Sequence, residues 1–345
     1  MGLQFKELVI KKEISISDLK GKVLAIDALN MLYQFLTTIR SVDGSVLTDS
    51  KGRVTSHLIG LFNRTSTLME QGLKLVFVFD GKAPELKQKT WEKRTTVKKE
   101  ASVKLQQAEE EGDLNSMRKF AARTAVLTRE MQEDAKEVIT ALGLPIVQAP
   151  SEGEAQTTQM VKNGDAYASV SQDYDNLIFG CPLLVRNLSI EGKKKKAGAF
   201  AYQKVNPELI SLSEVLENLK LNLDQLIVVA IVVGTDYNPG GIKNIGPKKG
   251  LKLLKEYGTD FKAVFEKVEW SKQYPDLSWQ EVFDTIKKMP VTNNYKLEWK
   301  KIDELKLLKL LVEEHNFSEE RVRSKILKLK ESQKEMAQKG LKNFF

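Results

Sequence analysis

The chain has 345 residues, with 54 lysines and arginines against 46 acids; its net charge of +8 weakly favours a polyanionic partner. Cys181 is the only cysteine, and His57 and His315 are the only histidines, which excludes a disulfide framework and a cysteine- or histidine-rich metal site. No apolar run approaches the roughly 18 residues that span a bilayer, and "MGLQFK" lacks a signal-peptide core, so we expect an intracellular protein.

Strand-like and helix-like segments alternate along the first half of the chain. The apolar runs are "KVLAIDA", "LKLVFVFDG", "LPIVQAP" and "DAYASVSQD", and segments such as "TREMQEDAKEVITALG" between them have helical periodicity. This alternation predicts an α/β fold in which helices wrap a mostly parallel central sheet.

The stretch from residue 84 to about 129 is polar and favours helix, with Gly112 and Asp113 as the expected break between two helices. Its apolar face is too thin for a core position. We therefore predict a helical arch that stands off the sheet.

A hairpin, a glycine-rich turn with a basic helix, and a tail are predicted after the fourth apolar run. "PLLVRNLS" and "AFAYQKV" flank "IEGKKKKAG", which predicts a hairpin whose basic loop, residues 193–196, we interpret as a solvated turn. "GIKNIGPKKGLKLLKEYG" predicts a glycine-rich turn opening a basic helix. We expect one main domain over residues 1–330 and a flexible tail over residues 331–345.

Acidic residues follow the strand-like runs. The carboxyl ends of parallel strands lie on one edge of a sheet, so we expect these acids to converge there. Without histidine or cysteine, the natural compensation for so many like charges is a hard divalent cation, Mg²⁺ or Mn²⁺. The candidate metal ligands are Asp27, Asp80, Glu152, Glu154, Asp173, Asp175 and Asp236.

Each acidic motif has a simpler interpretation when it is taken alone. Ser151 and Glu154 have capping-box spacing, Asp173 and Asp175 could form an Asx turn, and Asp80 precedes a glycine as in many turns. The recurrence of acids at several strand ends favours the metal site. Two metals about 4 Å apart are a standard arrangement for phosphodiester hydrolysis.

Longer motifs carry a family resemblance. "AIDALNMLYQFL", "VFVFDGKAPELK", "APSEGEAQ", "SQDYDNLIFG", "GTDY" and "IGPKKGLKLL" resemble, in order and over almost the whole chain, motifs of the flap endonucleases. These are structure-specific 5′ nucleases of DNA replication and repair, of archaeal and eukaryotic type. The resemblance implies a PIN-like 5′ nuclease fold, two Mg²⁺ ions for which Mn²⁺ can substitute, the same seven acids as ligands, and an arch enclosing a free 5′ strand.

The resemblance also assigns residues that contact DNA. Lys87 and Arg94, seven residues apart and thus on one helix face, match residues that contact the scissile phosphate, although both could instead simply solvate the helix. Tyr33 matches an aromatic that stacks on a base, with a core position as the alternative. Further contacts are implied at Gly2, Arg40 and Thr55.

Two more elements are implied near the end of the chain. Residues 234–258 resemble a helix-hairpin-helix type element that binds duplex phosphates, in the family often with K⁺; the DNA-binding residues there are Gly246, Lys248, Lys249 and Lys255. An extra residue in "YNPGGIKNIG" leaves the K⁺ ligands open. The terminal pattern over residues 338–345 is similar to a sliding-clamp (PCNA) binding motif, with a frayed tail as the alternative. Its residues are Gln338, Leu341, Phe344 and Phe345.

The sequence thus predicts a metal-dependent 5′ flap endonuclease and 5′-3′ exonuclease of Okazaki fragment maturation and repair. It would act on branched DNA as a monomer, in the cytoplasm or nucleoid of an archaeon or in a eukaryotic nucleus. The alternatives are a related nuclease that cuts bubbles or junctions, and a non-catalytic branched-DNA adaptor for the clamp.

Overall fold

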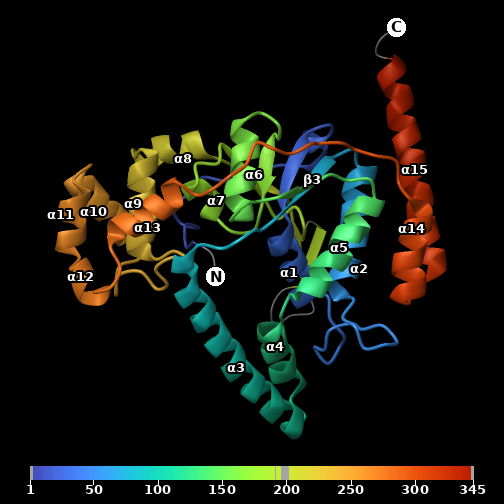
Figure 1. Ribbon diagram of the computed structural model, residues 1–345, viewed down its shortest axis with the longest axis horizontal. Coiled ribbons are helices and arrows are strands. Elements are labelled where there is room, and N and C mark those ends of the chain that lie inside the picture. The colour runs from blue at the N-terminus through green and yellow to red at the C-terminus, as the bar shows by residue number, and fades with distance from the viewer. Residues whose placement is uncertain (1–2, 191, 196–201, 343–345) are drawn as a thin grey trace. The chain divides into compact units, whose positions relative to one another are not determined.

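The computed structural model describes residues 3–190, 192–195 and 202–342 (Figure 1). The chain divides into two compact units, each built from three segments that are separate in the sequence. The first unit comprises Met1–Ser15, Asp80–Lys93 and Gln148–Asn293; the second comprises Ile16–Phe79, Arg94–Val147 and Asn294–Phe345. The single domain predicted for residues 1–330 stays a prediction, because this division groups residues by their contacts and does not define units that fold separately.

The second unit contains the strands in the order β2-β3-β4. Strands β2 and β3 are parallel, with Asp27 opposite Val78 at the end of the register. A glycine brings α1 and α2 together: a Cβ on Gly60 would lie 2.3 Å from the ring of Phe35. The elements of this unit are η1 (Ile16–Leu19), β2 (Val23–Asp27), α1 (Ala28–Thr38), α2 (Ser56–Glu70), β3 (Lys74–Phe79), α4 (Leu114–Thr124), α5 (Arg129–Ala141), β4 (Ile146–Gln148), α14 (Glu304–Leu308), the π-helical η3 (Lys309–Glu314) and α15 (Glu319–Lys342).

The first unit contains the strands in the order β1-β9-β6-β5. The β5–β6 pair is parallel, whereas β9 is antiparallel to both β6 and β1. Over the described part of the chain, a mixed set of parallel and antiparallel strands with flanking helices confirms the predicted α/β class. Its elements are β1 (Lys12–Glu13), the 3-10 turn η2 (Glu85–Lys87), α6 (Gly153–Lys162), β5 (Ala168–Val170), α7 (Asp175–Ile178), β6 (Leu183–Arg186), β9 (Glu208–Ser211), α8 (Leu212–Leu219), α9 (Leu223–Val233), α10 (Pro247–Tyr257), α11 (Phe261–Lys267), α12 (Trp270–Gln273) and α13 (Trp279–Lys287).

The predicted basic hairpin is present as the antiparallel pair β7 (Gly192–Lys195) and β8 (Tyr202–Val205). Lys193, Lys194 and Lys195 lie in β7, so they belong to a strand and not to the solvated turn that we predicted. Lys196, the last residue of that predicted turn, lies outside the described residues.

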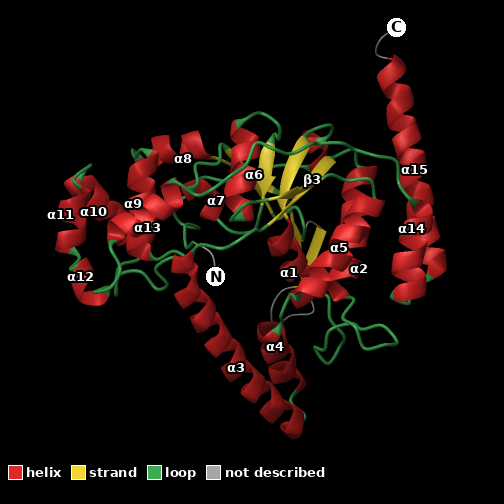
Figure 2. Ribbon diagram, viewed as in Figure 1, coloured by secondary structure: helices red, strands yellow, loops and turns green. Residues whose placement is uncertain are grey.

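The two helices predicted for residues 84–129 are α3 (Gln88–Glu111) and α4, joined by a short turn (Figure 2). Gly112 has a φ of +68°, and Asp113 caps α4 by accepting hydrogen bonds from the N–H groups of Asn115 and Ser116. The break therefore falls where the sequence predicts it. Val97 and Val103 of α3 are exposed, which agrees with the thin apolar face.

Helix α15 continues to Lys342, whereas the sequence analysis predicts a flexible tail from residue 331. Lysine, glutamate and glutamine, which are strong helix formers, make up seven of the twelve residues 331–342, so the helix propagates beyond its packed part. Ser332 Oγ still donates to the carbonyl of Glu70 in α2, at 2.7 Å. No helix in the described part of the chain is long and apolar enough to cross a membrane.

The loops that follow β3 and β4 approach each other closely within the first unit. The Gly81 N–H donates to the Ser151 carbonyl at 2.7 Å, and the Lys82 N–H donates to the Pro150 carbonyl at 3.1 Å. A Cβ on Gly81 would lie 2.2 Å from the Ala149 carbonyl oxygen. Only glycine allows the two backbones to come this close.

The two histidines of the chain both lie in the core of the second unit. His57 is fully buried, and neither of its ring nitrogens has a hydrogen-bond partner. His315 has carboxylates on both ring nitrogens, Asp49 at 3.2 Å and Asp134 at 3.7 Å. Burial and the neighbouring His315 lower the pKa of His57 to about 4, and the backbone of Met131 opposes this shift.

We expect His57 to make the fold sensitive to acid. The unfolded chain protonates His57 near pH 6.5, but the folded chain does so only near pH 4. The unfolded state therefore binds more protons in this window, and the free energy of unfolding falls by up to about 3 kcal/mol as pH drops through it. Denaturant unfolding at pH 7 and pH 4.5 should show a smaller acid-induced loss for His57→Met than for the wild type. Equal losses would contradict this role.

We expect Gly81→Ala to destabilise the protein by about 1–3 kcal/mol, because the new methyl group meets backbone atoms that cannot rotate away. Gly250→Ala is the matched control. Its Cβ would lie at an ordinary 3.4 Å from Val233, and alanine favours the helix interior. Thermal unfolding should separate the two variants, and equal melting temperatures would show that the Gly81 loop can move.

Candidate active site

Six of the seven predicted metal ligands belong to the first unit, and the surrounding loops hold several of them by hydrogen bonds. The Gly153 N–H donates to Asp80 Oδ1 at 2.8 Å, and the Leu3 N–H donates to Asp175 Oδ1 at 2.8 Å. Ser171 Oγ accepts from the Asp173 N–H at 3.2 Å. The six are Asp80, Glu152, Glu154, Asp173, Asp175 and Asp236.

The structure contradicts one of the simpler interpretations of these acids, the capping box of Ser151 and Glu154. Ser151 does not cap α6: Glu152 occupies the N-cap position without a side-chain cap bond, and Ser151 Oγ donates to the Lys82 carbonyl. Asp27, the seventh acid, lies in the second unit and caps α1 by accepting from the Asn30 N–H at 3.0 Å. The sequence analysis missed this capping role.

Lys87 places an ammonium group among the acids of the first unit. It ends η2, and its Nζ lies 2.5 Å from Glu152 Oε2 and 3.4 Å from Asp236 Oδ2. Its side chain is only 12% exposed. One cation therefore contacts two carboxylates that are more than 80 residues apart in the sequence, since they lie at positions 152 and 236.

The protonation equilibria reflect crowded negative charge. Burial and the neighbouring acids Asp173 and Asp236 raise the pKa of Asp175 to about 7. Burial also raises the pKa of Asp80 and of Glu152, against the opposing charge of Lys87. Burial lowers the pKa of Lys87, but its carboxylate partners outweigh burial and raise the pKa overall.

The donor set fits a hard divalent cation by its chemistry, because it consists of carboxylate oxygens whose buried negative charge Lys87 only partly compensates. Among the described residues, however, no three acidic, histidine or cysteine side chains are arranged as a metal site. The ligand assignments remain a prediction at this point.

Arg186 is a residue of this region that the sequence analysis missed. Its Nε donates to the Gln172 carbonyl at 2.9 Å, and its guanidinium group lies 4.0 Å from the centre of the Tyr174 ring. Its Nη1 also lies 3.3 Å from Glu208. Because Gln172 and Tyr174 flank Asp173, these contacts of Arg186 fix the loop that carries Asp173. The only sequence signal of Arg186 is a charge at the end of an apolar run.

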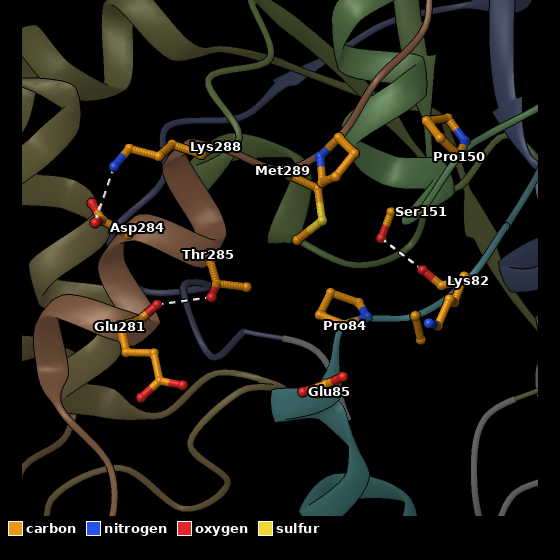
Figure 3. A pocket seen from close by; sticks show the side chains of 12 residues that line it. Lys82, Pro84, Glu85, Pro150, Ser151, Glu281, Asp284, Thr285, Lys288 and Met289 are labelled. Carbon is orange, nitrogen blue, oxygen red and sulfur yellow. Dashed lines mark hydrogen bonds and ion pairs between the residues drawn. The ribbon is translucent and has the colours of Figure 1, made fainter.

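A cavity of about 620 Å³ opens in the first unit beside the loop that leads to η2 (Figure 3). Its walls include Pro84, Ser151, Thr285 and Met289, and Lys288 pairs with Asp284 at its rim, at 3.0 Å. None of the predicted acids lines it. The sequence does not predict this cavity, because three separate segments form its walls.

The residues assigned to DNA contacts in the second unit differ in exposure. The Tyr33 ring is 37% exposed, with Lys98 Nζ 5.8 Å from its centre, so Tyr33 is not a core residue. Arg94 is exposed, whereas Thr55 is buried. Arg40 is half-buried: Nη1 donates to the Gly44 carbonyl, Nε and Nη2 lack partners, and burial lowers its pKa.

The predicted basic helix is α10, with Gly246 at its N-cap and Pro247 in its first turn. Lys248 and Lys249 are exposed beside this N-terminus, and Lys249 Nζ donates to the Asn244 carbonyl at 2.9 Å. Lys255 lies in the last turn. Gly2, Phe344 and Phe345 lie outside the described residues, and Gln338 and Leu341 lie in the terminal part of α15.

Comparison with known proteins identifies relatives over the entire length of the chain. Family models for the XPG N-terminal domain and the XPG I-region match residues 3–101 and 143–236. Flap endonuclease 1 of Pyrococcus horikoshii is 50% identical over 345 residues, covering 100% of this chain and 98% of the relative. Flap endonuclease 1 of Pyrococcus furiosus is 49% identical, covering 100% and 99%.

Solved structures agree with this result. Flap endonuclease-1 from Methanococcus jannaschii aligns with a TM-score of 0.75 at 42% identity, covering 96% of this chain and 98% of that one. The catalytic core of Rad2 in complex with DNA aligns with a TM-score of 0.71 at 21% identity, covering 95% and 100%, a likeness of fold alone. The resemblance and the predicted nuclease fold are thus confirmed, and the chain belongs to the flap endonuclease 1 family.

Proposed function

We propose that this protein is a structure-specific 5′ flap endonuclease and 5′-3′ exonuclease of DNA replication and repair. The observation that carries the proposal is the group of buried and half-buried acids around Lys87, in a chain that belongs to this family. Hydrolysis of one phosphodiester near the junction of a branched duplex would leave a 5′-phosphate and a 3′-hydroxyl.

Two Mg²⁺ ions, with Mn²⁺ as a substitute, are the proposed cofactors. Asp80, Glu152, Glu154 and Asp173 would hold them most directly, and Asp27, Asp175 and Asp236 partly through water. When bound, the cations offset the repulsion between the carboxylates and the scissile phosphate and lower the pKa of the attacking water.

The chain's own cations act on the substrate phosphate. Lys87 is held beside Glu152 and Asp236, where a phosphate oxygen would replace one of its carboxylate partners. Arg94 is the second proposed phosphate contact. The exposed Tyr33 side chain suits stacking on a base. Arg40 stays a proposed DNA contact, although the buried position of its Nε and Nη2 weakens this assignment. Gly2, which lies outside the described residues, is a further proposed DNA contact.

Other parts of the chain would select and hold the branched substrate. Helices α3 and α4 would form the arch around a free 5′ strand. The N-terminus of α10, with Gly246, Lys248, Lys249 and Lys255, would bind duplex phosphates, with K⁺ as a further ion at this element. Gln338, Leu341, Phe344 and Phe345 would bind the sliding clamp. Thr55 is buried, which weakens its assignment as a DNA contact.

The decisive experiment is cleavage of a double-flap DNA with a single-nucleotide 3′ flap, in Mg²⁺ and in EDTA. Metal-dependent incision close to the junction is expected, and a bulky group placed on the 5′ end before binding should suppress it. Preferred cleavage of bubble or four-way junction DNA would favour a related nuclease. Binding without any cut would favour an adaptor.

Asp173→Asn should abolish cleavage and leave DNA binding intact, because one metal-binding charge is removed while the loop bond from the Asp173 N–H is kept. Asp276→Asn, an exposed aspartate of the same unit, is the control. A DNA-binding assay gives the affinity, and a single-turnover assay gives the cleavage rate. Retained, fully metal-dependent cleavage would rule out the proposed role of Asp173.

Lys87→Ala should lower the cleavage rate at saturating DNA by about 100-fold, because an ammonium group on the scissile phosphate stabilises the transition state. Affinity should change far less. Lys82→Ala, an exposed lysine in the same loop, serves as the control for loss of charge. A parallel loss of rate and affinity would indicate simple phosphate binding.

Replacing Phe344 and Phe345 together by alanine should weaken binding to a purified sliding clamp by at least about 30-fold, because buried aromatic anchors dominate such interfaces. Surface plasmon resonance measures the affinity. Cleavage of flap DNA without the clamp should not change, and unchanged clamp affinity would reject the motif.

A further inference from the structure

The loop between α9 and α10, residues 234–246, folds back onto the end of α9. The Ile242 N–H donates to the Val232 carbonyl at 2.8 Å. Gly241 has a φ of +57°, and a Cβ there would lie 2.1 Å from the Val233 carbonyl oxygen. Asn238 Nδ2 also donates to the Ile231 carbonyl at 2.7 Å. The inner side of this loop is therefore fixed by α9.

A second set of hydrogen bonds fixes the other side of the loop, and it comes from the end of α12. The Lys243 N–H donates to Gln273 Oε1 at 3.0 Å, while Gln273 Nε2 donates to the Gly241 carbonyl. Tyr274 OH donates to the same carbonyl at 3.0 Å. The Gln273 amide thus uses both its acceptor and its donor on the backbone around Ile242.

An aromatic cluster holds α12 in place. The rings of Trp270 and Tyr274 stack at 4.4 Å, and Trp270 Nε1 donates to the Leu277 carbonyl at 2.6 Å. The rings of Phe265 and Trp279 stack at 4.5 Å with an interplanar angle of 11°. Gln273 therefore extends from a rigid base, although its own side chain is exposed.

The position of this loop decides where the N-terminus of α10 points. Gly246 ends the loop and caps the helix, and the first N–H groups of a helix have no partner within it. The sequence does not mark Gln273 for a role in recognising DNA, because its side chain carries no charge and it lies beyond the basic helix. The contact becomes visible only in the fold.

We propose that Gln273, assisted by Tyr274, is a positioning residue that holds the 234–246 loop in the conformation that binds duplex DNA. The inference rests on the proposed function. Gln273 does not touch the reacting atoms. Its loss should leave a loop that reaches the same conformation only part of the time, so duplex affinity falls while the chemical step proceeds normally on bound substrate.

The test measures the affinity of full-length Gln273→Ala for a blunt duplex by fluorescence anisotropy, together with steady-state cleavage of flap DNA. Losing both hydrogen bonds should weaken duplex binding and raise KM by about tenfold, with kcat unchanged. Tyr274→Phe removes one bond, so we expect about a threefold effect. This second variant keeps the proposal testable if Gln273→Ala folds poorly.

Gln280→Ala is the matched control. Gln280 lies on the neighbouring α13, where its side chain accepts a hydrogen bond from Ser278 Oγ and not from the 234–246 loop. The Gln280→Ala variant should therefore keep the wild-type duplex affinity and KM. Duplex affinities of Gln273→Ala and Tyr274→Phe within about twofold of wild type, too small for a lost hydrogen bond, would overturn the inference. An equal fall in kcat would overturn it as well. A wild-type protein that neither binds duplex nor cuts flaps would instead overturn the proposed function.

Discussion

The ion pair of Lys87 with Glu152 and Asp236 is the interaction on which the candidate active site depends. Carboxylates crowded together repel one another, and burial together with the charges of Asp173 and Asp236 raises the pKa of Asp175 to about 7. A single ammonium group offsets part of this charge at 2.5 and 3.4 Å. Three processes can relieve this repulsion: protonation of a carboxylate, pairing with Lys87, and the binding of external cations.

The backbone around the acids restricts their movement. Gly81 lets the loops after β3 and β4 exchange hydrogen bonds, and Arg186 clamps the loop before Tyr174. Such supports matter because carboxylates that could swing apart would reduce their repulsion by separating. Loop packing keeps the acids close together, and their mutual repulsion favours the binding of a cation.

The sequence predicted the fold class, the break at Gly112 and the acids that follow the strands, because these depend on local periodicity and on the geometry of parallel strands. It did not predict that α15 continues to Lys342, since helix propensity there outweighed the polar composition. The roles of Arg186 and Gln273 also escaped it. Both side chains bind backbone carbonyls of other segments. Because every residue carries a backbone carbonyl, the sequence does not show which one is bound.

The interleaving of the first unit has a consequence for biosynthesis. Its three segments run as far as residue 293, and the ion pair of Lys87 needs Asp236, which leaves the ribosome long after Lys87 does. Until then, the earlier acids are part of an incomplete chain that cannot close its core. Folding with such long-range contacts is slow and favours assistance by chaperones. A nascent chain would thus lack the Lys87–Asp236 pair until residue 236 has been translated.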